Sequence, residues 1–271
     1  MRPGPLTERR AWRQRTVKCA VIGLGEAGGR YATALADQGH EVIGVDPADN
    51  PTPDGVRRVG SVQEAATGAE FVLVMTGAAA SPGIARAVAP YLLSGVCYAD
   101  FTSSAPAVME QLARVVEATG ASFADVAILG PVTWHGAHTP LMVSGSGAGA
   151  VEKLMRTVGA KVEPLDAPAG AAMAHKLLRS VFMKGIASTI WEAVEAGRVA
   201  GYEQWARDQI ASQLAGDGHA VIERLLTGTR LHAERRSIEM KDTAAYLESL
   251  GVTPVMTRAT EASLRRIAAA Q

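Results

Sequence analysis

The sequence is poor in cysteine, carries no net charge and contains no long apolar run. Its two cysteines, Cys19 and Cys97, stand inside short apolar segments, which is typical of buried free thiols and argues against a disulfide. Lysine and arginine together number 27, as do aspartate and glutamate, so the bulk charge favours neither nucleic acid nor a membrane surface as a partner. No apolar run approaches the roughly 20 residues of a membrane span.

The N-terminus lacks the apolar stretch that a secretion signal needs, although its first residues are basic. Prolines and charges favour a disordered arm over residues 1–16. Free cysteines suit a reducing compartment, so we expect a cytoplasmic protein. The length of 271 residues is large for one core and comfortable for two domains.

Short β-type runs alternate with helical stretches up to about residue 165. Mostly apolar runs, as expected for strands covered on both faces, lie at 17–23, 41–46, 71–76, 96–101, 124–129 and 141–145. The alternation predicts a doubly wound, mostly parallel sheet with right-handed crossovers. The crossover between 46 and 71 holds only a short helix, so we expect one strand there to be short or missing.

Helical periodicity replaces this pattern from Pro168 to the C-terminus. The sequence therefore predicts an α/β domain over residues 17–166 and an all-helical domain over 167–271. Within the second domain we expect four helices, at 168–199, 203–227, 231–250 and 254–270.

A glycine-rich segment directly after the first apolar run carries the clearest functional signal. It reads Gly23-Leu24-Gly25-Glu26-Ala27-Gly28 and opens a helix, which is the setting of the dinucleotide-binding turn of a Rossmann domain. In that turn the first glycine allows the tight bend, the second lets the pyrophosphate approach the backbone, and the third lets helix and strand pack closely. The alternative is a glycine-rich turn that binds no ligand.

Asp46 ends the second run, close to the distance at which an acidic residue binds the adenosine ribose hydroxyls. A carboxylate there repels a 2′-phosphate, so the sequence favours NAD over NADP. Arg57 and Arg58 follow and leave NADP open, unless they are a solvated charged pair. Thr76, at the end of the run 71–76, is a further cofactor-site candidate.

With these motifs in place, the chain resembles the β-hydroxyacid dehydrogenases, which include 3-hydroxyisobutyrate and 6-phosphogluconate dehydrogenases. The resemblance rests on GLGEAG at 23–28, ADFTSSAP at 99–106 and GAAMAHKLLRS at 170–180. The C-terminal stretch resembles the helical domain of a less characterised branch. The resemblance implies an oxidoreductase that transfers a hydride between a nicotinamide cofactor and a small β-hydroxy acid or its oxo acid.

The same resemblance makes Lys176 the general acid/base, because alcohol oxidation releases a hydroxyl proton and reduction returns it. Ser180 stands where the family tends to have asparagine and would orient the lysine or the substrate. Thr102 is a candidate for the cofactor ribose and Ser103 for the substrate. The alternative is that both hydroxyls cap the following helix.

The substrate loop of the family usually reads Ser-Gly-Gly, but here the corresponding stretch is 130–136, GPVTWHG. Thr133, Trp134 and His135 become substrate candidates, with an ordinary loop histidine as the alternative for His135. His138 completes an H-x-x-H pattern, but no third ligand accompanies it and we expect no metal.

Two other functions stay open at this stage. Imine reductases share the two-domain plan but usually lack the lysine, and a sensor module would bind NAD without turnover. Family members commonly dimerise through their helical domains, so the resemblance implies a homodimer.

Overall fold

The computed structural model describes residues 15–271, so the expected N-terminal arm lies almost entirely outside the described part of the chain. The chain divides into two compact units, Met1–Leu178 and Arg179–Gln271. Among residues 15–271, no helix combines the length and the apolar character that crossing a bilayer requires.

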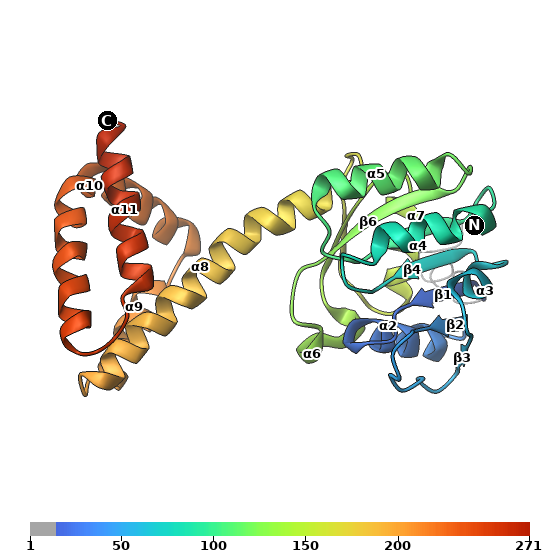
Figure 1. The fold of residues 1–271 in the computed structure, drawn as a ribbon, viewed down its shortest axis with the longest axis horizontal. Coiled ribbons are helices and arrows are strands. Elements are labelled where there is room, and N and C mark those ends of the chain that lie inside the picture. Colours follow the sequence, from blue (N-terminus) through green and yellow to red (C-terminus); the bar gives the residue numbers. More distant parts are fainter. Residues whose placement is uncertain (1–14) are drawn as a thin grey trace, which may run out of the picture. The chain divides into compact units, whose positions relative to one another are not determined.

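An eight-stranded sheet in the order β3-β2-β1-β4-β5-β6-β7-β8 forms the centre of the first unit (Figure 1). All neighbouring strands are parallel except β6 and β7, so the expectation of a mostly parallel sheet is confirmed. The order reverses at β1, which places the loops after β1 and β4 beside the crevice where such sheets bind ligands. The strands are β1 (Lys18–Ile22), β2 (Glu41–Val45), β3 (Val56–Arg58), β4 (Phe71–Val74), β5 (Cys97–Asp100), β6 (Ser122–Ile128), β7 (Leu141–Ser144) and β8 (Val162–Pro164).

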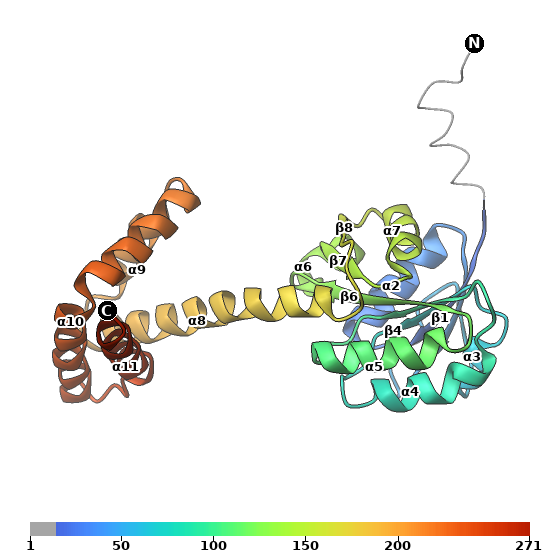
Figure 2. The same ribbon diagram turned by 90° about the horizontal axis from the view of Figure 1, so that it is seen from above.

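Helices cover both faces of this sheet and enclose two separate apolar clusters. On one face lie α2 (Glu26–Asp37) and α7 (Ala148–Thr157), and on the other lie α3 (Val62–Ala66), α4 (Ser81–Val88) and α5 (Pro106–Glu117) (Figure 2). The central strands are buried on both sides, which explains why their sequences read as continuous apolar runs. The first turn of α8 (Ala171–Val199) joins the second face through Ala172 and Met173.

The second unit is entirely helical in its described residues, as the periodicity predicts. It contains the rest of α8, then α9 (Glu203–Leu214), α10 (Gly218–Ser249) and α11 (Val255–Ala269). In both ribbon views α10 and α11 lie side by side (Figures 1 and 2).

Two helix boundaries in this unit differ from the prediction. The helix expected at 203–227 ends at Leu214, because Gly216 has a φ of +97° and Asp217 starts a new helix by accepting a hydrogen bond from the N–H of His219. The helix expected to begin at 231 is instead the second part of α10, which bends at His232, where φ is −129°. Helical periodicity is similar before and after residues 215–217 and before and after His232. It therefore could not show that one helix ends at Leu214 or that α10 continues through His232.

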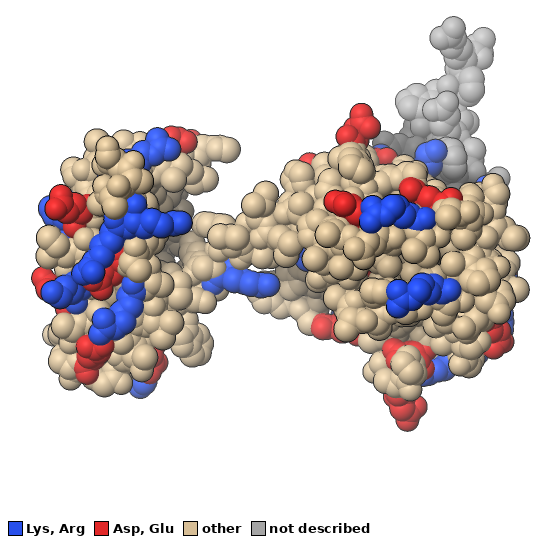
Figure 3. Space-filling model, turned by 45° about the horizontal axis from the view of Figure 1, so that its top comes forward, with Lys and Arg blue, Asp and Glu red and all other residues tan. Residues whose placement is uncertain are grey.

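Charged side chains of both signs are mixed on the helical unit (Figure 3). Several form ion pairs one turn apart, including Arg207 with Glu203 at 2.7 Å and Arg235 with Glu239 at 2.9 Å. Such exposed pairs each stabilise a helix by only about 0.3–0.5 kcal/mol. These ion pairs therefore add little stability, and they lie among exposed apolar side chains of the same unit.

Candidate functional site

Three glycines after β1 have three different surroundings. Gly23 turns the chain with a φ of +98°, and a Cβ on it would lie 2.6 Å from the carbonyl oxygen of Met75. A Cβ on Gly28 would lie 1.8 Å from the carbonyl oxygen of Gly23, so α2 packs against β1 only with glycine there. A Cβ on Gly25 would meet nothing within 4 Å. The first and third glycines serve the fold, and the second faces open space that a ligand can occupy.

The N-terminus of α2 opens onto that space. Gly25 is its N-cap residue and no side chain caps the helix, so the first-turn N–H groups keep their capacity to bind an anion. Leu24 is buried beneath the turn, whereas Glu26 is exposed in the first turn and Ala27 is half-buried. These features fit the pyrophosphate of a dinucleotide.

Asp46 follows β2 and is held against the glycine turn. Its Oδ2 accepts a hydrogen bond from the N–H of Leu24 at 2.7 Å, and its Oδ1 accepts one from the N–H of Ala48 at 2.8 Å. Burial acts to raise the pKa of Asp46, but these bonds and one from the Asn50 side chain outweigh it and lower the pKa. The carboxylate is therefore charged at neutral pH, beside the place where the adenosine ribose would lie.

The two arginines near Asp46 are already engaged. Arg58 donates to the backbone carbonyl oxygens of Asp46 at 2.9 Å, Ala48 at 2.6 Å and Asn50 at 2.5 Å. Arg57 lies on β3 and pairs with Glu64 at 3.8 Å. Arg58 thus stabilises the conformation of the loop after β2 by binding three of its backbone carbonyl oxygens.

A lysine and a serine meet at the carboxyl end of β5. Lys176, in the second turn of α8, donates a hydrogen bond from Nζ to Oγ of Ser103 at 2.9 Å. Ser103 is exposed in the turn after β5, and the neighbouring Thr102 and Ser104 are buried and hydrogen-bonded to each other at 2.7 Å. β5 is two strands from β1, a separation of about 10 Å at ~4.8 Å per strand. The lysine–serine pair therefore stands within the length of a dinucleotide bound at the glycine turn.

The other candidates are spread over several elements. Thr76 is half-buried after β4, beside Gly23. Thr133, Trp134 and His135 belong to α6 (Val132–His135), which contacts α2, and all three are exposed, Trp134 by 82%. Ser180 follows Lys176 by one turn of α8 but belongs to the second unit.

Two buried acidic residues lie near the lysine, and the sequence assigns a role to neither of them. Asp100 and Asp125 stand opposite each other on β5 and β6, and both are fully buried. Burial raises the pKa of each, while hydrogen-bond donors around them oppose that rise. The signal in the sequence was a single acidic residue inside an otherwise apolar strand, in the runs VCYADF and ADVAIL.

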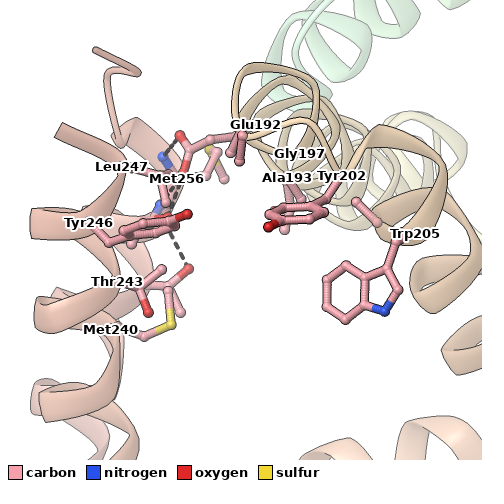
Figure 4. Close-up of a pocket in the computed structure, with 16 residues that line it drawn as sticks. Glu192, Ala193, Gly197, Tyr202, Trp205, Met240, Thr243, Tyr246, Leu247 and Met256 are labelled. Carbon is pink, nitrogen blue, oxygen red and sulfur yellow. Dashed lines mark hydrogen bonds between the residues drawn. The ribbon is translucent and has the colours of Figure 1, made fainter. Parts of the chain in front are cut away.

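The helical unit contains a hollow of its own, of about 480 Å³ (Figure 4). Its walls are mostly apolar and include Tyr202, Trp205 and Tyr246. Glu192 at its edge is not free, because its carboxylate accepts hydrogen bonds from the N–H groups of Met256 at 2.6 Å and Thr257 at 2.8 Å. Tyr202 and Tyr246 bring hydroxyl groups to this hollow, whereas the hydrogen bond between Lys176 and Ser103 lies in the first unit.

A family model for the NAD-binding domain of 6-phosphogluconate dehydrogenase matches residues 18–165, more than half of the chain. The chain belongs to this family. Its first unit is accordingly a Rossmann-type NAD-binding domain of an oxidoreductase family, as the glycine turn predicts. A second model, a domain of unknown function named DUF1932, matches residues 198–267 in the helical unit.

Solved structures resemble this family member along almost its whole length. A conserved hypothetical protein from Sinorhizobium meliloti 1021 is 25% identical, with a TM-score of 0.61, covering 94% of this chain and 89% of that one. The conserved protein MTH1747, described as similar to 3-hydroxyacid dehydrogenases, is 25% identical with a TM-score of 0.61, covering 92% and 96%. An imine reductase from Myxococcus stipitatus, solved with NADP+, shares the fold, with 18% identity, a TM-score of 0.80 and coverage of 93% and 94%. No curated protein matches the chain.

Proposed function

We propose that this protein is a nicotinamide-dependent dehydrogenase that interconverts a small β-hydroxy acid and its oxo acid. The observation that carries the proposal is the hydrogen bond of 2.9 Å between Nζ of Lys176 and Oγ of Ser103, at the sheet edge that also presents the glycine turn. A lysine fixed beside a cofactor site is the feature that acid–base catalysis on an alcohol or carbonyl requires.

In this proposal the bound nicotinamide supplies or accepts the hydride, and Lys176 handles the proton. As an ammonium, Lys176 donates a proton to the carbonyl oxygen during reduction, and as an amine it accepts the hydroxyl proton during oxidation. Ser103 fixes Nζ by accepting its hydrogen bond. For the remaining substrate contacts we propose Thr133, Trp134, His135 and Ser180.

The cofactor we propose is NAD rather than NADP. Glycines 23, 25 and 28 with the N-terminus of α2 would hold the pyrophosphate, and Asp46 would accept hydrogen bonds from the adenosine ribose. Thr76, beside Gly23, is proposed for the same site, as is Thr102, whose side chain is buried and hydrogen-bonded to Ser104. The support is the charged carboxylate of Asp46, which would repel a 2′-phosphate, and the engagement of Arg58 with three backbone carbonyl oxygens.

Replacing Asp46 by asparagine should erode the preference for NADH over NADPH. A hydrogen bond to a charged group is worth about 1.5–3 kcal/mol, so kcat/KM with NADH should fall by about 10- to 100-fold. The value with NADPH should rise or stay constant, because the repulsive charge is gone. Steady-state kinetics with both cofactors measure this, with Asp49→Asn, an exposed neighbour in the same loop, as the control. An unchanged cofactor ratio would refute the role of Asp46.

The reaction itself is tested by following NADH and NADPH oxidation with a panel of oxo acids and cyclic imines. Turnover of an oxo acid supports the proposal and begins to define the substrate. Turnover of imines alone would favour the second candidate function, an imine reductase. This candidate is retained because the chain shares its fold with the Myxococcus stipitatus imine reductase. Tight cofactor binding without any turnover would instead indicate a sensor.

We also propose a homodimer, because the helical unit leaves large apolar side chains uncovered. Trp191 is 77% exposed, Leu231 71% and Trp205 65%, whereas the buried apolar residues of this unit are mainly alanines. A surface of this kind marks an interaction site. Light scattering at micromolar concentration should give twice the chain mass of 28.3 kDa, and a mass of one chain would contradict the proposal.

A further inference from the structure

Two paired aspartates have no role in the reaction outlined above. Asp100 on β5 and Asp125 on β6 are partners in the sheet register, and neither side chain is exposed. A buried carboxylate is costly unless donors surround it, so the donors show what the carboxylate holds in place. Here the backbone donors, the N–H groups of Thr102, Gly170 and Met173, come from the two segments that carry the lysine–serine pair.

Asp125 anchors the beginning of α8. Its Oδ2 accepts hydrogen bonds from the N–H groups of Gly170 and Met173, both at 3.0 Å. Ser144 on β7 donates to the same oxygen at 3.2 Å and accepts from the N–H of Ala172 at 3.0 Å. The backbone N–H groups that a helix start leaves without partners are thus bound by side chains of two strands. A negative charge is also favourable at this end of a helix.

Asp100 fixes the turn that carries Ser103, as Asp125 fixes the beginning of α8. Its Oδ1 accepts a hydrogen bond from the N–H of Thr102 at 2.8 Å, and its Oδ2 accepts one from Ser81. The turn that carries Ser103 is therefore tied to β5, and the helix that carries Lys176 is tied to β6. Because the two strands are adjacent and in register, the sheet sets the distance between the lysine and the serine.

We propose that Asp125, assisted by Ser144, is a positioning residue for Lys176. Met173, whose N–H it binds, precedes Lys176 by three residues, or about 4.5 Å along the helix axis. Shifting or rotating this turn would move Nζ away from Ser103 and from the reacting atoms. This inference rests on the proposed function of Lys176, and a displacement of about 1 Å at such a group can cost about 10²-fold in rate.

The two oxygens of Asp125 make the test sharp. All three donors bind Oδ2, whereas Oδ1 is buried without a hydrogen-bond partner among the described residues. Asp125→Asn can present its carbonyl oxygen to the donors and place its amide where Oδ1 stands, so it should retain the anchor. Asp125→Ala removes the anchor. Ser144→Ala is the milder variant, should Asp125→Ala fail to fold, because it breaks only the contact with Ala172 and the bond to Asp125.

The experiment is a double-mutant cycle of Asp125→Ala and Lys176→Met, with NADH affinity measured for each protein. Asp125→Ala should lower kcat by about 10²-fold when Lys176 is present. It should change the residual rate by less than about twofold when Lys176 is absent, because the two effects are coupled. Asp125→Asn should restore most of the rate. Ser61→Ala, which removes the N-cap of α3, controls for loss of a helix cap elsewhere.

A readout independent of turnover separates this inference from the proposed function. The acylation rate of Lys176, followed by mass spectrometry, should change in Asp125→Ala or Ser144→Ala, while that of Lys184 on the same helix should not. Unchanged acylation, or an equal loss of kcat in both cycle backgrounds, would overturn the positioning role. A changed acylation rate together with an active Lys176→Met would uphold the positioning role and reject the proposed function.

Discussion

Replacing Lys176 by methionine is expected to reduce turnover by about 10²- to 10⁴-fold, the usual contribution of a positioned acid–base group. Methionine keeps the length of the side chain but cannot donate or accept the proton. The affinity for NADH should be unchanged, because the glycine turn follows β1 and Asp46 follows β2, whereas Lys176 lies on α8 beside the end of β5. The measurement pairs steady-state kinetics on the identified substrate with a fluorescence titration of NADH.

A matched control is available on the same helix. Lys184 is exposed in α8, and Lys184→Met removes an equal charge from a position outside the proposed site. It should leave kcat within the error of the wild type. If Lys176→Met turns over at a similar rate to Lys184→Met, the acid–base role of Lys176 is wrong, and a reductase that takes its proton elsewhere becomes the better hypothesis.

The elements that the sequence predicts well are those with a local and repeated signal. Six of the eight strands have four or more residues and are mostly buried, so their apolar sequences identify them. These strands are β1, β2, β4, β5, β6 and β7. The strands β3 and β8 have three residues each, and β3 contains Arg57 and Arg58, so no periodicity can develop in them. The break at Gly216 and Asp217 had a local signal, because a glycine and a capping aspartate stand together, but helical periodicity on both sides obscured it.

The candidate site divides in the same way. The glycine turn and Asp46 are close in sequence and follow known spacing, so the sequence alone indicates them. Asp125 could not be assigned a role, because its donors Gly170 and Met173 are 45 and 48 residues away along the chain. Its sequence context shows only an acidic residue in an apolar strand. The partners of such a residue are set by strand order and by the start of α8, which periodicity does not reveal.

Replacement by alanine should destabilise the protein strongly at Gly28 and only slightly at Gly25, although both glycines belong to the same turn. A Cβ on Gly28 would lie 1.8 Å from the carbonyl oxygen of Gly23, so α2 must move away from β1. Overpacking of this kind costs about 1–3 kcal/mol or more, and Gly28→Ala should lower the free energy of unfolding by at least that amount. A Cβ on Gly25 would meet nothing within 4 Å, and its φ of −66° suits alanine. Gly25→Ala should therefore cost less than about 1 kcal/mol.

The affinity for NADH should nevertheless fall in Gly25→Ala, although this variant is expected to remain stable. If the open space at Gly25 is where the pyrophosphate approaches the backbone, the added methyl group breaks at least two hydrogen bonds to a charged group and raises the dissociation constant of NADH by about 10²-fold or more. Urea unfolding of the free protein and calorimetric titration with NADH measure the two quantities separately. Wild-type affinity in Gly25→Ala would show that the dinucleotide does not bind at this turn. Loss of stability in that variant would show instead that Gly25, like Gly23 and Gly28, serves the fold.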